Sequence, residues 1–175
     1  MIEEADGAAT TEPFRGLAFN LSSLGYSVSK GFTQTLAPFD LHPREFALLR
    51  AVGFQEGLSQ QALGDRLQIP RSRMVAIVDE LEERGLLERR PNLTDRRVRE
   101  LHLTEAGREL LDQAFREAAA YEQQVSSQLN SEERERLLDL LERVSAGLGV
   151  APGIHTALRD AAGENGCPGD PPSPD

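Results

Sequence analysis

The spacing of apolar residues changes from the helical period of about 3.6 to the strand period of 2 within residues 86–103, and this change limits the fold most strongly. Apolar and polar side chains alternate in LLERR (86–90) and in VRELHL (98–103). The intervening PNLTDRR is rich in turn-forming residues and carries two arginines. Alternation on both sides of such a turn predicts a β-hairpin with a long basic tip. Helical spacing dominates elsewhere, so we expect a mainly α protein with a small β-wing.

Four helices are predicted before the hairpin. Gaps of three and four between apolar residues indicate a long helix over 14–37. A second helix begins at Pro43, where Glu45 can reach back toward a cap at His42. Ser59 is expected to cap a short third helix. A fourth begins after Pro70 and stops at Gly85, a residue type that suits a left-handed helix end.

Two further helices are predicted after the hairpin. The first extends over 104–129 with Thr104 as its cap, and the second over 131–148 begins at Ser131. Together with the helix over 14–37, they carry more apolar surface than a small winged core of about residues 42–104 can cover. We therefore expect these three long helices to form a dimer interface.

The ordered domain is expected to be residues 14–148, with flexible ends at 1–13 and 149–175. The first end is acidic and has no apolar core, so no signal peptide is predicted. The second is rich in glycine and proline, which favours a flexible tail. The chain contains no run of about 18 apolar residues, as a membrane span needs. We expect a cytoplasmic protein.

The charge of the chain is unevenly distributed. The whole chain has a net charge of −10, yet residues 66–99 hold nine arginines and six acids, a net charge of +3. Residues 105–175 have a net charge of −8. Arginine binds phosphates and guanine edges with two parallel hydrogen bonds. A DNA-binding middle segment is therefore compatible with the acidic total, although a solvated charged surface has the same composition.

The order of the predicted elements is that of a winged helix-turn-helix. The start of the fourth helix is expected to enter a major groove of DNA. The hairpin tip can reach phosphates or the minor groove, and the start of the third helix offers N–H donors to phosphate. The residues at these three places are Arg71, Ser72 and Arg73, then Arg96 and Arg97, and finally Ser59 and Gln60.

Residues 58–110 resemble the MarR family of bacterial transcriptional regulators. The most specific pieces are VDELEERGLLERR (78–90) and NLTDRRVRELHLTEAG (92–107), preceded by LHPREFALLRAV (41–52). The resemblance extends over about 14–148. It implies a homodimer that binds double-stranded DNA at a pseudo-palindromic operator. Such a regulator is usually a repressor that is released by a small effector, often a phenolic compound or an oxidant.

The resemblance also assigns residues to roles. It puts five positions on the start of the recognition helix and three on the wing, where the aspartate commonly orients an arginine that enters the minor groove. These are Arg71, Ser72, Arg73, Met74 and Val75, and Asp95, Arg96 and Arg97. Relatives often have threonine where Arg73 and Val75 stand and arginine where Ala76 stands. The operator sequence therefore does not follow from the resemblance.

Several assignments keep an alternative at this stage. Arg71 and Arg73 can contact DNA or pair with an acid such as Asp79. Arg89 and Arg90 can contact phosphates or keep a sheet edge soluble, and we include Arg90 among the expected DNA contacts. The resemblance implies an effector pocket where the first two helices approach the long helix after the wing, although the same residues can simply fill a core. These are Leu24, Ser27, Val28, Phe32, His42 and Phe46.

No catalytic, metal or cofactor site is predicted. The three histidines lie far apart, the chain has one cysteine, and no phosphate-binding loop or nucleophile motif occurs. The main hypothesis is a DNA-binding repressor that responds to an effector. The alternative is a winged-helix module that serves only protein–protein assembly.

Overall fold

A computed structural model describes residues 16–67, 69–92, 94–95 and 97–150. The predicted flexible end 1–13, and residues 151–175 of the predicted tail, lie outside these ranges. The elements in chain order are α1 (Leu17–Leu36), the 3-10 turn Ala37–Phe39, α2 (Pro43–Phe54), α3 (Gln60–Leu67), α4 (Arg71–Glu83), β1 (Leu87–Pro91), β2 (Arg99–Leu103), α5 (Glu105–Val125) and α6 (Ser131–Gly147).

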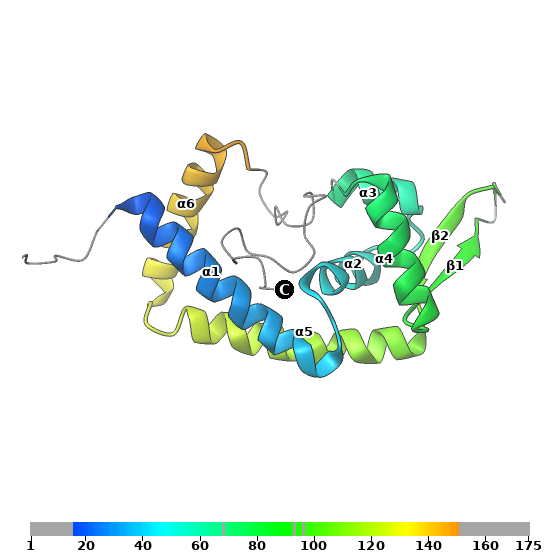
Figure 1. The fold of residues 1–175 in the computed structure, drawn as a ribbon, viewed down its shortest axis with the longest axis horizontal. Coiled ribbons are helices and arrows are strands. Elements are labelled where there is room, and N and C mark those ends of the chain that lie inside the picture. The colour runs from blue at the N-terminus through cyan, green and yellow to red at the C-terminus, as the bar shows by residue number, and fades with distance from the viewer. Residues whose placement is uncertain (1–15, 68, 93, 96, 151–175) are drawn as a thin grey trace, which may run out of the picture.

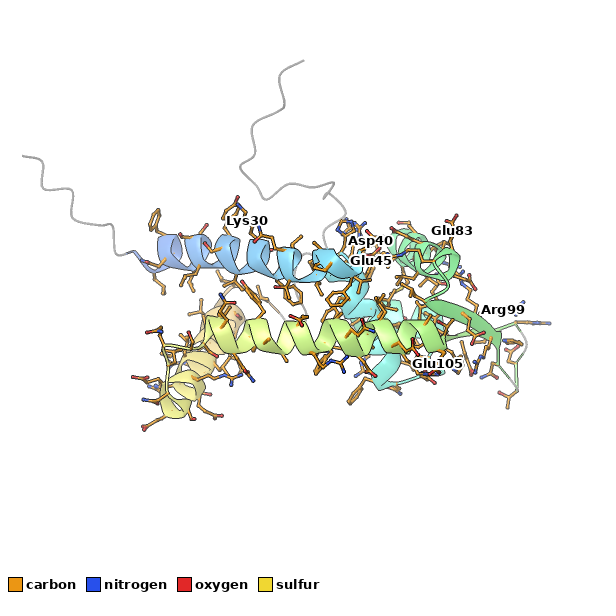
Figure 2. All side chains as sticks on the ribbon, turned by 90° about the horizontal axis from the view of Figure 1, so that it is seen from below. Lys30, Asp40, Glu45, Glu83, Arg99 and Glu105 are labelled. Carbon is orange, nitrogen blue, oxygen red and sulfur yellow. The ribbon has the colours of Figure 1, made fainter. Side chains whose placement is uncertain are left out.

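These elements form the expected mainly α fold with a small β-wing. In Figure 1, α2, α3, α4 and the β1–β2 hairpin lie together at one end, and α1 and α6 lie at the other. α5 extends from the hairpin to α6, and α1 lies beside it (Figures 1 and 2). None of the helices in the described part of the chain has the length and apolar character needed to cross a membrane.

The hairpin has the predicted alternation of faces. β1 and β2 pair antiparallel, with Leu87 opposite Leu103 and Arg89 opposite Leu101. The three leucines are buried against the helices, whereas Arg90, on the other face of β1, is exposed. A residue at every second position of a strand points to the same face, so the solvent face is left for charged side chains.

Local hydrogen bonds explain where most helices begin. The Glu45 carboxylate accepts from the main-chain N–H of His42 at 2.7 Å, as predicted for α2. Ser59 Oγ accepts from the N–H of Ala62 at 3.1 Å and caps α3. Thr104 Oγ1 accepts from Gly107 at 2.9 Å and caps α5.

The boundary between the last two helices differs from the prediction. α5 ends at Val125, four residues before the expected Leu129. The cap of α6 is Asn130, whose side chain accepts from the N–H of Glu133, and Ser131 is the first helical residue. The Glu133 carboxylate accepts from the Asn130 N–H in return. This reciprocal pair satisfies two otherwise free donors and sets the start of the helix.

One hydrophobic core joins the winged part to the long helices. It is built from α2, α3, α4 and the hairpin, together with the fully buried Leu36 of α1 and Ala114 of α5. α1, α5 and α6 keep many apolar side chains exposed in the single chain. These include Leu17, Phe19, Leu24, Tyr26, Phe115, Val125, Leu137, Leu138, Leu140, Leu141 and Leu148.

Candidate nucleic-acid interface

A groove of about 500 Å³ opens between the starts of α3 and α4 and the tip side of the wing. It brings together six of the predicted DNA-contacting residues, although they come from three separate segments. These are Ser59, Gln60, Arg71, Met74, Val75 and Arg97. The groove thus combines two helix N-termini, which carry partial positive charge, with arginine side chains.

The first turn of α4 presents side chains to two different sides. Arg71 and Val75 line the groove next to the wing. Ser72 and Arg73 instead line a second hollow of about 340 Å³, together with Arg44 of α2. Helical residues one position apart point about 100° away from each other, so the first turn of α4 presents polar side chains along both of its flanks.

Met74 was also among the expected DNA contacts, and this stays a prediction, although the residue lines the groove with very little exposed surface. The residue is only 1% exposed and belongs to the hydrophobic core. Its side chain packs beside Gly64 of α3, the position where a Cβ would lie 3.8 Å from the methionine Cε. Met74 therefore joins α3 to α4.

The wing turn is organised by Asn92. Its Oδ1 accepts from the main-chain N–H groups of Thr94 and Asp95, both at 2.8 Å. The Asp95 carboxylate in turn accepts a hydrogen bond from the main-chain N–H of Arg97 at 3.0 Å. The resemblance implied that Asp95 would orient the Arg97 guanidinium, whereas this hydrogen bond is made by the Arg97 backbone. Arg96, also an expected DNA contact, lies outside the described residues.

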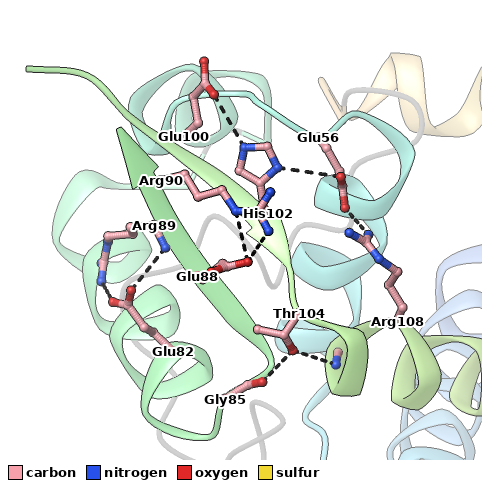
Figure 3. A network of polar contacts seen from close by, with 11 residues as sticks. Glu56, Glu82, Gly85, Glu88, Arg89, Arg90, Glu100, His102, Thr104 and Arg108 are labelled. Atoms are coloured by element: carbon pink, nitrogen blue, oxygen red, sulfur yellow. Dashed lines mark hydrogen bonds and ion pairs between the residues drawn. The ribbon is translucent and has the colours of Figure 1, made fainter. Parts of the chain in front are cut away.

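The arginines of β1 are engaged with acids. Arg89 pairs with Asp79 at 2.5 Å and with Glu82, and its guanidinium donates to Gln60 Oε1 (Figure 3 shows the Glu82 pair). Asp79 was considered as a partner for Arg71 or Arg73, but the ion pair that the structure shows for it is with Arg89. Arg90, an expected phosphate contact, is exposed and pairs with Glu88 on its own strand.

A second polar network joins the base of the wing to α5 (Figure 3). Arg108 of α5 donates to Glu56 in the loop after α2. His102 of β2 lies between two carboxylates, with Nδ1 3.7 Å from Glu56 and Nε2 3.5 Å from Glu100. The hydrogen bond from Arg108 lowers the pKa of Glu56 below its ordinary value of 4.5. Asn92 also donates to Glu100, which connects this network to the wing turn.

Three polar residues of the groove were missed by the sequence analysis, namely Gln61, Asp65 and Arg99. Arg99 is exposed on β2 and lies at the wing end of the molecule (Figure 2). The alternation that identified the strand put Arg99 on the same face as Leu101 and gave no reason to expect a groove beside it. Gln61 carried no signal, because neutral residues at the start of a helix are common on any surface.

The predicted effector-pocket residues are in part separated from one another. Phe32 and Phe46 pack edge to face with ring centroids 5.7 Å apart, and Tyr121 of α5 lies 6.3 Å from Phe32. Leu24 is 62% exposed, two helical turns away on α1, and His42 is also exposed. The aromatic group lies where α1, α2 and α5 meet, and the full set of six remains a prediction.

Acidic and histidine side chains do not form a metal site in the described ranges, since no three potential ligands gather there. The groove is lined by hydrogen-bond donors, three guanidinium groups and the starts of two helices. This donor-rich concave surface suits a polyanion.

Comparison with known proteins agrees with this interpretation. A family model described as MarR family matches residues 39–98. The HTH-type transcriptional regulator MhqR of Bacillus subtilis (strain 168) is 32% identical over 134 residues, which are 77% of this chain and 92% of MhqR. The transcriptional repressor CouR, bound to a 23-mer DNA duplex, superposes with a TM-score of 0.68 and 31% identity, covering 74% of this chain and 92% of CouR. CouR from Rhodococcus jostii RHA1 bound to p-coumaroyl-CoA gives a TM-score of 0.64 and 30% identity, covering 75% and 92%.

Proposed function

Because this chain belongs to the MarR family of DNA-binding transcriptional regulators, we propose that it represses transcription by binding a pseudo-palindromic operator as a homodimer. A cytoplasmic location accompanies that role. We assign the chain no enzymatic activity, since the family consists of transcription regulators. The proposal rests on the groove between α3, α4 and the wing.

The composition of this groove is the observation that carries the proposal. Three arginines line it, Arg71, Arg97 and Arg99, against a single carboxylate, Asp65. Guanidinium groups on a concave surface attract phosphates, and the exposed side of α4 can enter the major groove between them. The acidic α5 and α6, which contain most of the −8 charge after residue 104, lie on other faces and limit binding to unrelated DNA.

The exposed apolar side chains of α1, α5 and α6 support a dimer. An apolar surface of this extent is rarely left in water by a folded chain. A two-fold dimer would place two identical grooves about one helical turn of DNA apart, which requires an inverted repeat in the operator. CouR, the relative seen with a DNA duplex, is described as a transcriptional repressor.

The effector is proposed to be a small aromatic compound. The rings of Phe32, Phe46 and Tyr121 lie where the long helices meet the winged part, and a bound aromatic molecule could separate these elements. Such a ligand releases DNA only if it binds the DNA-incompetent dimer more tightly than the competent one. The related CouR has been seen with p-coumaroyl-CoA, an aromatic thioester.

The test is selection of bound duplexes from a random library, followed by affinity measurements at several salt concentrations. We expect an inverted repeat, and a plot of log affinity against log salt with a slope of about −5 if each subunit makes three phosphate contacts. Selected duplexes without dyad symmetry, or a DNA affinity that does not change with salt concentration, would contradict the proposal and favour protein–protein assembly.

A further inference from the structure

Arg89 connects one strand to two helices through a single guanidinium group. Its side chain is 21% exposed and pairs with Asp79 and Glu82 of α4. Its Nε and Nη2 also donate to Gln60 Oε1 at 3.2 and 3.1 Å. The main-chain N–H of Arg89 donates to Glu82 at 3.2 Å, so the strand itself is tied to the same acid. The side chain is thus held by three partners.

This arrangement determines the orientation of the Gln60 amide. A guanidinium group can only donate hydrogen bonds, so the amide atom that faces it must be the oxygen. Two donors reach that oxygen, which holds the planar amide in one orientation. The NH₂ group of Gln60 is consequently directed away from Arg89. Gln60 is also one of the residues that line the groove beside the wing.

The charge around Arg89 argues against a direct phosphate contact. Two carboxylates already surround the guanidinium, so the local net charge of the trio is −1. Arg71, Arg97 and Arg99, by contrast, are exposed and line the groove. Moving Arg89 onto a phosphate would leave Asp79 and Glu82 without this partner next to the DNA, which is electrostatically costly.

We propose that Arg89 is a positioning residue that fixes the Gln60 amide, so that its NH₂ donates to a phosphate oxygen of the operator. A phosphate is favoured over a base edge because Gln60 is the first residue of α3, where Ser59 and the helix N-terminus also attract anions. This inference rests on the proposed function, since it names a contact within the same interface.

The test is a double-mutant cycle on the selected operator duplex with Gln60→Ala, Arg89→Met and the double variant. Each single substitution is expected to weaken binding about tenfold through loss of one hydrogen bond to a charged group. The double variant is expected to lose clearly less than the sum of the two single losses, because Arg89 acts through Gln60, and only the loss from the unpaired Asp79 and Glu82 adds to that of Gln60→Ala. Fully additive losses would overturn the proposal.

Salt dependence provides a readout that distinguishes positioning from direct contact. Neither Gln60→Ala nor Arg89→Met removes a charge from a phosphate, so the salt slope is expected to stay unchanged. A direct arginine–phosphate contact would instead lower its magnitude by about 1 for each subunit. A reduced slope in Arg89→Met would therefore contradict the proposal.

Gln60→Glu tests the need for the Gln60 NH₂ group while the ion pairs of Arg89 with Asp79 and Glu82 stay in place. The new carboxylate keeps an acceptor for the guanidinium but has no NH₂ donor, so the fold is retained and operator binding falls at least tenfold. Normal binding by a folded Gln60→Glu would refute the inference. Thermal unfolding of each variant checks that the fold is intact, and Gln60→Glu remains decisive if Arg89→Met does not fold.

The chain offers a matched control. Arg66 Nη1 donates to Gln55 Oε1 at 2.6 Å, an arginine–glutamine pair that joins α3 to the end of α2 and is not part of the groove lining. Arg66→Met is expected to bind the operator like the parent chain. If the parent chain itself selects no duplex, the proposed function fails; if it binds and Gln60→Glu binds equally, only this inference fails.

Discussion

Glu56 is a single residue on which three segments of the chain converge. Its carboxylate accepts from Arg108 of α5 and lies 3.7 Å from Nδ1 of His102 on β2. The hydrogen bond from Arg108 is the main reason that the pKa of Glu56 lies below its ordinary value. A lowered acid pKa means that the folded state prefers the ionised form, so this contact stabilises the fold above the ordinary pKa.

We expect Glu56→Gln to lower the free energy of unfolding at neutral pH. The difference between parent and variant should shrink as the pH falls through the lowered folded-state pKa of Glu56, where the parent carboxylate also becomes neutral. Urea unfolding of both proteins between neutral and acidic pH measures this. Glu122→Gln, which removes an exposed pair with Arg134 at 3.5 Å, is the control and should show little effect. A pH-independent difference at Glu56 would contradict the assignment.

Two arginine substitutions separate phosphate contact from base contact. Arg97→Ala is expected to weaken binding to all sequences and to reduce the salt slope by about 1 for each subunit. Arg73→Ala, on α4, is expected to cost roughly 1–3 kcal/mol and to relax the preference at one base pair. Affinities for the operator and for single-base variants measure both effects. Unchanged binding by Arg97→Ala at moderate salt would show that the wing does not contact DNA.

At the scale of the elements, the start of α5 packs directly against the main chain between α4 and β1. A Cβ at Gly107 would lie 2.0 Å from the Leu86 carbonyl oxygen, which is main chain and cannot move aside like a side chain. Thr104 reinforces the same junction, because its hydroxyl donates to the Gly85 carbonyl at 2.6 Å (Figure 3). Here α5 is joined to the winged part.

Gly107→Ala is therefore expected to destabilise the protein by roughly 1–3 kcal/mol through overpacking. Gly64→Ala is the matched control in another buried helical glycine, where the new Cβ would meet its nearest atoms at 3.5 and 3.8 Å, ordinary contact distances. There we expect a gain of about 0.5–1 kcal/mol from the better helix former. Denaturant unfolding compares the two, and a Gly107→Ala protein as stable as Gly64→Ala would contradict the packing argument.

At the scale of the whole molecule, the leucines on α6 are left about 40% exposed within the described chain. Leu137 and Leu141 lie one helical turn apart and are both exposed, as is Leu148 at the C-cap of the helix. A second copy of the chain is the occupant that the proposed function requires. The dimer would also set the distance between the two grooves, and hence the spacing of the operator half-sites.

We expect the protein to sediment as a dimer at micromolar concentration. Leu141→Glu should shift it toward monomer and weaken operator binding, because a carboxylate would be buried at the interface without a partner. Ala146→Glu introduces the same side chain on the opposite face of α6, where it should have little effect. A folded parent monomer, or equal behaviour of the two variants, would disprove the dimer assignment.

What the sequence determined by itself rests on contacts between near neighbours in the chain. The caps at Ser59 and Thr104, the reach of Glu45 to His42 and the alternation of the hairpin each depend on residues a few positions apart. Such interactions follow from the local order of residue types. They were sufficient to predict the winged helix-turn-helix, and the specific wing residues indicated the family.

Only the tertiary structure decided which side chains are buried, paired or presented to a ligand. Gln60 and Arg89 are 29 residues apart, and Glu56 and Arg108 are 52 apart. Met74 is buried in the core at the floor of the groove, whereas Arg71 and Val75, which line the same groove, are exposed. The angle at which α4 packs on α3 and the strands determines these outcomes, because burial and pairing depend on the whole set of packed elements and not on any local segment.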